Sequence, residues 1–129
     1  MGYSVCQMVQ SGKLKIRTRE VGNVLVVALE GEVLLGRESV LMRDAVRTEL
    51  DAGRKFVLLN LAQVSFMDSS GVGVLVEIKA HTLHSGGDIR LCNCPDLVTK
   101  LLYRLALIKI LAVYESEEAA LDGWAGGNP

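Results

Sequence analysis

The chain has 129 residues, half of them hydrophobic, and a formal net charge of −1. This length allows one domain with a buried core, and the hydrophobic share argues against disorder. Acidic and basic residues are mixed without a basic tract, which argues against nucleic-acid binding. No apolar run approaches the length of a membrane span, and no secretory signal is evident. The three cysteines, an odd number, are most simply free thiols, so we expect a cytoplasmic protein.

The first part of the chain predicts a β-hairpin followed by an amphipathic helix. Residues 1–14 lack a regular pattern, and we expect a loosely held arm. Residues 15–21 alternate as an edge strand does, and residues 24–30 are a continuous apolar strand after a Gly-Asn turn. After a loop over residues 31–36, apolar residues recur at helical spacing as far as Leu50.

The rest of the chain predicts strands that alternate with helices. In order we expect a strand over residues 56–61, a helix over 72–84, a strand over 88–92, a helix over 95–105, a strand over 110–114 and a helix over 116–121. Residues 123–129 are expected to form a tail whose Trp124 either docks or stays free. This order predicts a single α/β domain over residues 15–122.

One polar stretch stands where the strand over residues 56–61 leads into the next helix. It consists of Asp68, Ser69 and Ser70, followed by Gly71 and, two residues on, Gly73. Such a stretch lies at the edge of a sheet and at a helix N-terminus, where amide groups lack intrahelical partners. Each glycine costs about 1 kcal/mol inside a helix relative to alanine, and the close approach of a ligand or another backbone would explain it. The structural alternative is an ordinary capped helix.

The helix over residues 72–84 is apolar on more than one side. Five residues are assigned to the side that faces the sheet: Val72, Leu75, Val76, Ala80 and Leu83. Val74 and Ile78 then fall on the other side, where either a partner protein or another helix of the chain covers them. In the first case Ser70, Val74 and Ile78 form a continuous exposed strip at i, i+4 and i+8.

Catalytic and metal-binding alternatives have weaker support. A serine hydrolase needs a histidine base beside its nucleophile, but His81 and His84 lie more than ten residues after Ser69 on the same predicted helix. Pairs as loose as these histidines, or Cys92 and Cys94, are common by chance, and structural zinc takes four closely spaced ligands. No phosphate-binding loop of the Walker type occurs. We therefore expect neither an enzyme nor a bound metal or cofactor.

Residues 66–74, Phe-Met-Asp-Ser-Ser-Gly-Val-Gly-Val, closely resemble the signature of the bacterial anti-sigma factor antagonists, which are small STAS-domain proteins. Weaker matches extend the resemblance to about residues 15–121. They are Leu29–Glu32, Gly86–Asn93, Pro95–Leu105 and Ile110–Ala120. The resemblance implies a single STAS-like α/β domain, with a mixed sheet of about five strands and helices mainly on one face.

In the family it resembles, the hydroxyl residue directly after the aspartate is phosphorylated by a partner kinase, which is also the anti-sigma factor. By motif this residue is Ser69, with Ser70 the second choice. The resemblance implies a binding module that sequesters the anti-sigma factor when unphosphorylated and so frees a sigma factor, with a serine phosphatase reversing the modification. The residues expected to contact the partner are Glu32, Asp68, Ser69, Ser70, Gly71, Gly73, Val74 and Ile78.

One position departs from the family pattern. The family commonly has an aspartate after the Gly-Glu-apolar sequence, whereas here Leu34 follows Gly31, Glu32 and Val33. Two alternatives therefore stay open. The protein is either a phosphorylated switch or a non-switching STAS scaffold, such as a subunit of a signalling assembly or of a lipid-trafficking complex.

Overall fold

The computed structural model describes residues 7–122 and residue 124, which form six strands and four helices. In chain order these are β1 (Gln7–Ser11), β2 (Leu14–Val21), β3 (Val24–Val33), α1 (Arg37–Asp51), β4 (Phe56–Met67), α2 (Ser69–His84), β5 (Asp88–Cys92), α3 (Asp96–Arg104), β6 (Ala112–Tyr114) and α4 (Glu117–Leu121).

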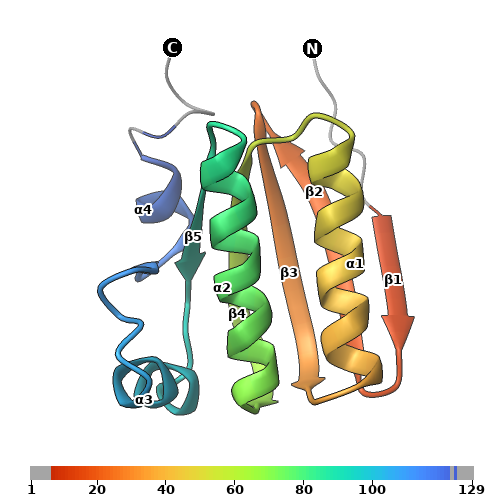
Figure 1. Cartoon of the computed structure of the whole chain (residues 1–129), viewed down its shortest axis with the longest axis vertical. Helices are drawn as coiled ribbons and strands as arrows, with labels where there is room; N and C mark the ends of the chain where they lie inside the picture. Colours follow the sequence, from red (N-terminus) through yellow and green to blue (C-terminus); the bar gives the residue numbers. More distant parts are fainter. Residues whose placement is uncertain (1–6, 123, 125–129) are drawn as a thin grey trace.

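One mixed sheet organises the molecule, and its strands lie side by side in chain order (Figure 1). The first three strands are antiparallel, and β3 to β6 are parallel because each is joined to the next by a helix. The predicted mixed α/β domain is confirmed. The sheet has one strand more than the five that were expected. The additional strand is β1, whose residues were expected to belong to a loose arm; residues 1–6 of that arm lie outside the described part.

Alternation along the strands gives the sheet two different faces. Helices α1, α2 and α3 lie over the front face (Figure 1), and Leu25, Val27 and Leu59 belong to the main core together with buried residues of these helices. On the back face, Val24, Val26 and other alternate residues form a second, smaller cluster with α4. Trp124 joins this back cluster with only 7 % of its surface exposed, so it docks rather than staying free.

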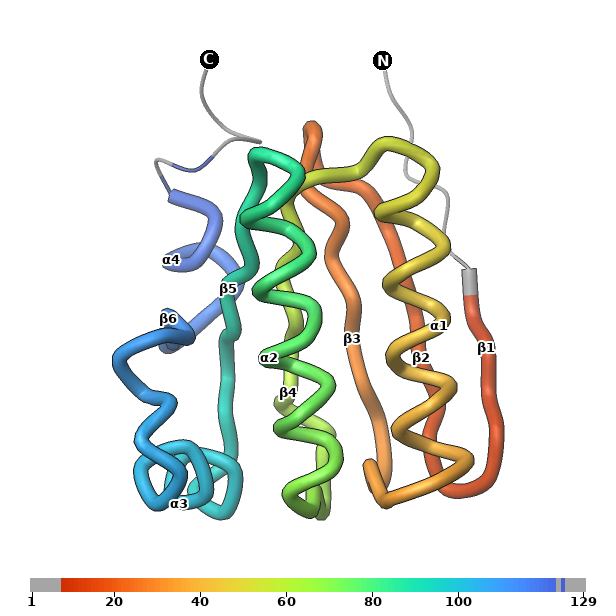
Figure 2. The backbone as a smooth tube through the Cα atoms, in the orientation of Figure 1, coloured from red at the N-terminus to blue at the C-terminus, as the bar shows by residue number. Residues whose placement is uncertain are grey.

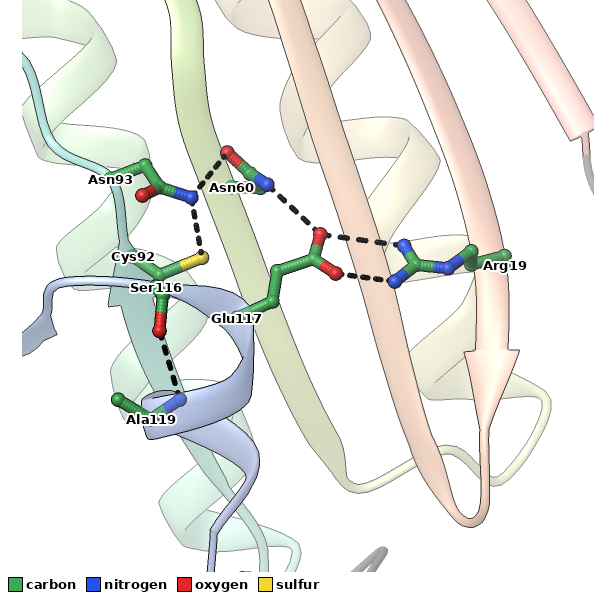
Figure 3. Close-up of polar contacts among 7 residues, drawn as sticks. All are labelled: Arg19, Asn60, Cys92, Asn93, Ser116, Glu117 and Ala119. Carbon is green, nitrogen blue, oxygen red and sulfur yellow. Dashed lines mark hydrogen bonds and ion pairs between the residues drawn. The ribbon is translucent and has the colours of Figure 1, made fainter.

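Polar contacts hold α4 against the back of the sheet (Figure 3). The Glu117 carboxylate accepts hydrogen bonds from both terminal nitrogens of Arg19 on β2 and from the side-chain amide of Asn60 on β4, the latter at 2.9 Å. The guanidinium carbon of Arg90 lies over two aromatic rings, 5.0 Å from the centroid of Tyr114 and 4.5 Å from that of Trp124. It also donates a 2.7 Å hydrogen bond to the carbonyl of Ala120.

The observed strand and helix boundaries differ from the predicted ones mainly near the candidate site. Strand β4 continues to Met67, and α2 begins at Ser69, three residues before the apolar repeat at Val72. At the other end of the chain, β6 is two residues shorter at its start than predicted, while Ser116 caps α4 as expected by accepting from Ala119 N.

The exposed strip considered on α2 is absent, and the alternative that another helix of the chain covers Val74 and Ile78 holds. Val74 and Ile78 are only 6 % and 3 % exposed, and both belong to the main core together with the apolar residues of α1. Ala80 and Leu83, expected to face the sheet, are exposed. A second helix, α1, therefore covers the side of α2 that the strip hypothesis left open.

Candidate functional site

The polar stretch lies where the carboxyl ends of β3 and β4 meet the first turn of α2. The loop between β3 and α1 runs past the same end of the sheet (Figure 2). The amide of Asp68 donates to the carbonyl of Val33 at 3.2 Å, which joins the two strand ends. Met67, directly before Asp68, is buried in the core and fixes the position where the chain turns into the helix.

Asp68 is the N-cap of α2 and also holds the neighbouring loop. One carboxylate oxygen accepts from the amides of Ser70 at 3.0 Å and Gly71 at 3.3 Å, and from the Ser70 hydroxyl. The other accepts from the amide of Leu35 at 2.9 Å. Burial on its own would raise the pKa of Asp68, but the hydrogen bonds from Ser70, Leu35 and Gly71 outweigh it and lower the pKa below its ordinary value. The side chain is therefore an anion that connects the loop and the helix.

The two serines of the stretch differ in what their hydroxyls contact. The Ser70 side chain is half-buried, and its hydroxyl donates to Asp68. Ser69 is exposed at the first position of α2, and among the described residues its hydroxyl has no hydrogen-bond partner. A modifying enzyme could reach Ser69 without breaking a contact of the fold, whereas the Ser70 hydroxyl would first have to break its hydrogen bond to Asp68.

The two glycines of the first turns have different roles. A Cβ added at Gly71 would lie 2.7 Å from Met67 Cγ and 2.9 Å from Val33 Cγ1, so close packing of the helix on the strand ends requires a glycine there. This is a structural reason, which the sequence analysis did not foresee. At Gly73 an added Cβ would meet nothing within 4 Å, and the residue is exposed. The fold does not need this glycine.

Two apolar side chains are exposed near this end of the sheet. Leu35 is 78 % exposed in the loop that Asp68 holds, and Phe66 is 47 % exposed near the end of β4. The sequence analysis did not identify Leu35. The sequence signal that could have identified it is that two apolar residues, Leu34 and Leu35, follow the end of β3 at Val33. Glu32 lies opposite Phe66 in the β3–β4 register and forms an ion pair with Lys13 at 3.8 Å.

The histidines and cysteines weighed as alternatives are not assembled into a site. His81 and His84 lie in the last turn of α2, about 18 Å and about 22 Å from Ser69 by helix rise. Burial raises the pKa of Cys92 to about 12 and that of Cys94 to about 11, so both are thiols at neutral pH. Within the described part of the chain, no three potential metal ligands come together.

A groove of about 380 Å³ between α1 and α2 is also separate from the polar stretch. It lies beside His81 and His84, and its floor includes Leu50 and Ile78. Its rim is occupied by ion pairs of the protein itself, such as Arg47 with Glu77 at 3.7 Å. Over residues 7–122, no helix is both long and apolar enough to cross a membrane.

Comparison with known proteins agrees with this geometry. The sequence profile of the STAS domain matches residues 15–120. A protein of Paenibacillus polymyxa named anti-sigma F factor antagonist is 32 % identical over 113 residues, which cover 84 % of this chain and 92 % of that protein.

Solved structures show the same fold. The anti-sigma factor antagonist SpoIIAA, solved in its unphosphorylated form, superposes with a TM-score of 0.69 at 24 % identity, over 92 % of this chain and 94 % of its own. SpoIIAA of Bacillus has also been solved in its phosphorylated form. An anti-sigma factor antagonist from Mycobacterium paratuberculosis gives a TM-score of 0.72 at 17 % identity, over 84 % of this chain and 91 % of its own.

The fold, with a polar helix start at the carboxyl edge of a mixed sheet, is that of a STAS domain. Since the match to the Paenibacillus protein covers most of both chains, this chain belongs to the anti-sigma factor antagonist family of STAS-domain proteins. The family is regulatory and not enzymatic.

Proposed function

We propose that this protein is a phosphorylation-controlled binding module which, when unphosphorylated, binds an anti-sigma factor with serine kinase activity and so frees a sigma factor. The observation that carries the proposal is the exposed hydroxyl of Ser69 at the start of α2, which has no hydrogen-bond partner within residues 7–122. It is supported by the name of the Paenibacillus relative and by the solution of SpoIIAA in both unphosphorylated and phosphorylated forms.

The proposed phosphate would enter an environment with two opposing influences. The N-terminus of a helix favours an anion, because its first amides and its dipole point towards it. The ionised Asp68 directly precedes Ser69 and repels the charge of about −1.5 to −2 that a phosphate would add. Because Asp68 already receives its hydrogen bonds from Ser70, Gly71 and Leu35, we expect the fold to survive and the new charge to face the solvent or the partner.

The proposed docking surface consists of the loop over residues 34–36, Ser69 and Gly73. Leu35 supplies an exposed apolar contact, and Gly73 leaves space for a partner's backbone beside the first turns of α2. Asp68 fixes the loop relative to the helix through Leu35, so the surface is organised before binding. Val74 and Ile78 are no longer assigned to it because they are buried.

The position of Leu34 keeps the non-switching scaffold as a second candidate. This half-buried leucine stands in the loop next to Asp68, where the family commonly has an aspartate that would approach a kinase. If kinase recognition needs that carboxylate, the protein would bind without being modified.

The test is to recover the partner by affinity purification of the tagged chain, incubate both with ATP and Mg²⁺, and map phosphate by mass spectrometry. We expect phosphate on Ser69, unchanged labelling of a Ser70→Ala variant and none on Ser69→Ala. Labelling of Ser70 alone would contradict the assignment of Ser69. A partner that binds but leaves both serines unmodified would favour the scaffold.

A further inference from the structure

Several large side chains are exposed on helix α3 and in the turn that follows it. Tyr103 is 64 % exposed, and three aliphatic side chains nearby are exposed as well: Leu97, Leu105 and Ile110. The helix is attached through Val98 and Leu102, which are buried in the main core on its other side. Figure 1 shows α3 at a corner of the molecule, at the end of the sheet that also carries the start of α2. The exposed side chains are therefore free to contact something outside the fold.

Three cations stand among these apolar side chains. Residues 95–111 contain Lys100, Arg104 and Lys109 but only one acid, Asp96, in a chain with a net charge of −1. All three cations are exposed, and among the described residues their side chains have no hydrogen bond or ion pair. Helical spacing places Lys100 and Arg104 on the same side of α3 as Tyr103.

The turn over residues 107–111 keeps Lys109 close to the helix. The amide of Leu107 donates to the carbonyl of Leu102 at 2.8 Å, and the amide of Ile110 closes the turn on the carbonyl of Leu107 at 2.9 Å. Helix and turn together form a basic surface, which consists of Leu97, Lys100, Tyr103, Arg104, Lys109 and Ile110.

The elements packed against α3, which are mainly β4 and α2, do not neutralise this surface. Strand β4 has no charged residue. On α2, Glu77 pairs with arginines of α1, and Lys79 pairs with Asp88 of β5. The carboxylate of Asp68 is engaged with the loop before α1 and with the first amides of α2. Among the described residues, no acid of β4 or α2 is therefore left to pair with the cations of the basic surface.

The two remaining acids near α3 lie at its start. Asp96 is in the first turn, where the helix dipole favours it, and Glu115 follows Tyr114, whose carbonyl accepts from the amide of Asn93 just before the helix. Arg104 is about 12 Å from Asp96 by helix rise, which exceeds the Debye length of about 8 Å at physiological ionic strength. The helix end and the turn after it are therefore positive.

We propose that the basic surface binds the anionic headgroups of a lipid bilayer, with its apolar tips at the boundary between headgroups and acyl chains. Lysine is depleted in the cores of protein–protein interfaces, which argues against a protein as the occupant. At a bilayer, Lys and Arg stems lie along apolar surface while their charges reach the headgroups, and tyrosine is enriched at that depth. Exposed aliphatic groups among unpaired cations on a protruding helix fit this environment.

This association takes place at the bilayer surface and needs no spanning helix. Helix α3 follows β5, whereas Ser69 begins the helix after β4, so the basic surface and the candidate site are neighbours at one end of the sheet (Figure 1). Ser69 is not part of the basic surface. The inference does not rest on the proposed function, and its test does not involve the anti-sigma factor.

The test is co-sedimentation of the full chain with vesicles of phosphatidylcholine alone and with vesicles in which every third lipid is phosphatidylserine. We expect binding to the anionic vesicles only, and weaker binding as salt rises from about 0.1 M to about 0.5 M. Each basic residue near an anionic surface strengthens binding about fivefold, so Lys100→Glu with Arg104→Glu should weaken it at least tenfold. The matched control, Arg17→Glu with Lys55→Glu, changes the net charge equally at exposed positions away from α3 and should weaken binding far less.

A second variant tests the apolar contact. Tyr103→Trp adds an indole on the basic surface, and brominated lipids in the anionic vesicles should quench its fluorescence but not that of the buried Trp124 in the unaltered chain.

The vesicle and salt measurements on the unaltered chain decide the proposal even if a variant fails to fold. Absence of binding to anionic vesicles, equal binding to both kinds of vesicle, equal weakening by the control variant, or an unquenched indole would overturn the proposal. Binding to poly-glutamate without binding to vesicles would also overturn it, because the surface would then fit an acidic protein.

Discussion

The two faces of the sheet are covered in different ways. Three helices, α1 to α3, cover the front with an apolar core that runs from Leu14 on β2 to Leu111 before β6. One short helix and Trp124 cover part of the back, and their attachment includes the hydrogen bonds of Glu117 (Figure 3). The guanidinium of Arg90 also lies over the Trp124 ring. Burial on the front is non-directional, whereas the contacts on the back need particular partners and one ionised carboxylate.

This difference explains where the candidate site lies. Helix α2 rests on the front core along its length, so its first turn is held firmly while the Ser69 hydroxyl stays exposed. A new charge at Ser69 can then alter a binding surface without altering the packing beneath it. We expect the front face to determine global stability and the back face to open more easily.

The largest effect that we expect is from Val74→Lys on the front face. The substitution places an ammonium group in the core between α1 and α2, where it has no partner, and should lower the free energy of unfolding by about 3 kcal/mol or more. Urea denaturation followed by circular dichroism measures it. The matched control is Val40→Lys at a valine that is 41 % exposed, for which a change within about 0.5 kcal/mol is expected. Equal effects would remove the distinction between the two positions.

On the back face, Glu117→Gln should cost about 1–3 kcal/mol, because it weakens the hydrogen bonds with Arg19 and Asn60. The loss should be seen in Trp124 fluorescence at lower denaturant than in circular dichroism, since α4 and Trp124 detach first. Glu118→Gln, an exposed change in the same helix, is the control. Coincident transitions by both probes would show that the back cover does not open independently.

The back face should also respond to pH. The hydrogen bond from Arg19 lowers the pKa of Glu117 below its ordinary value of 4.5, against the opposing effect of burial. A lowered folded-state pKa means that the stabilisation is complete above about pH 4.5 and is lost as the pH falls through the folded value. Glu117→Gln should therefore flatten part of the decline in stability below pH 4.5. If the decline is unchanged in this variant, other carboxylates cause the loss of stability at low pH, among them Asp68, whose pKa is also lowered.

The smallest effects are expected at the two glycines of α2, with opposite signs. Gly71→Ala crowds Met67 and Val33 and should destabilise the protein by about 1 kcal/mol. Gly73→Ala meets open space and should stabilise it by about 0.5–1 kcal/mol through helix propensity. If Gly73 faces the partner, the stabilised variant should nevertheless bind it more weakly. Tighter or equal binding would remove Gly73 from the docking surface.

Local features could be predicted from the sequence, whereas contacts between distant residues could not. Apolar strands and helix caps such as Asp68 and Ser116 leave local patterns, and both residues cap helices as expected. The pair Arg19–Glu117 joins residues 98 positions apart and leaves no periodic signal. The sequence could not decide between a partner and another helix over Val74 and Ile78, because α2 is apolar on several sides and spacing alone does not show which side the neighbouring helix covers.

The candidate site was predictable for the same reason that the caps were. Asp68, Ser69 and Ser70 follow one another in the sequence and are adjacent in the structure, while the contribution of Leu35 depends on a hydrogen bond between residues 33 positions apart. The structural need for Gly71 likewise depends on Val33, on another strand.

The central claim is that a phosphate on Ser69 removes binding without disturbing the fold. The most direct measurement is calorimetric titration of the partner with unphosphorylated protein and with protein phosphorylated to completion, with circular dichroism on both samples. We predict at least a tenfold loss of affinity and identical spectra. Equal affinity of the two forms would contradict the claim, and so would loss of helical signal on phosphorylation, because Ser69 would then be a structural part of the helix start.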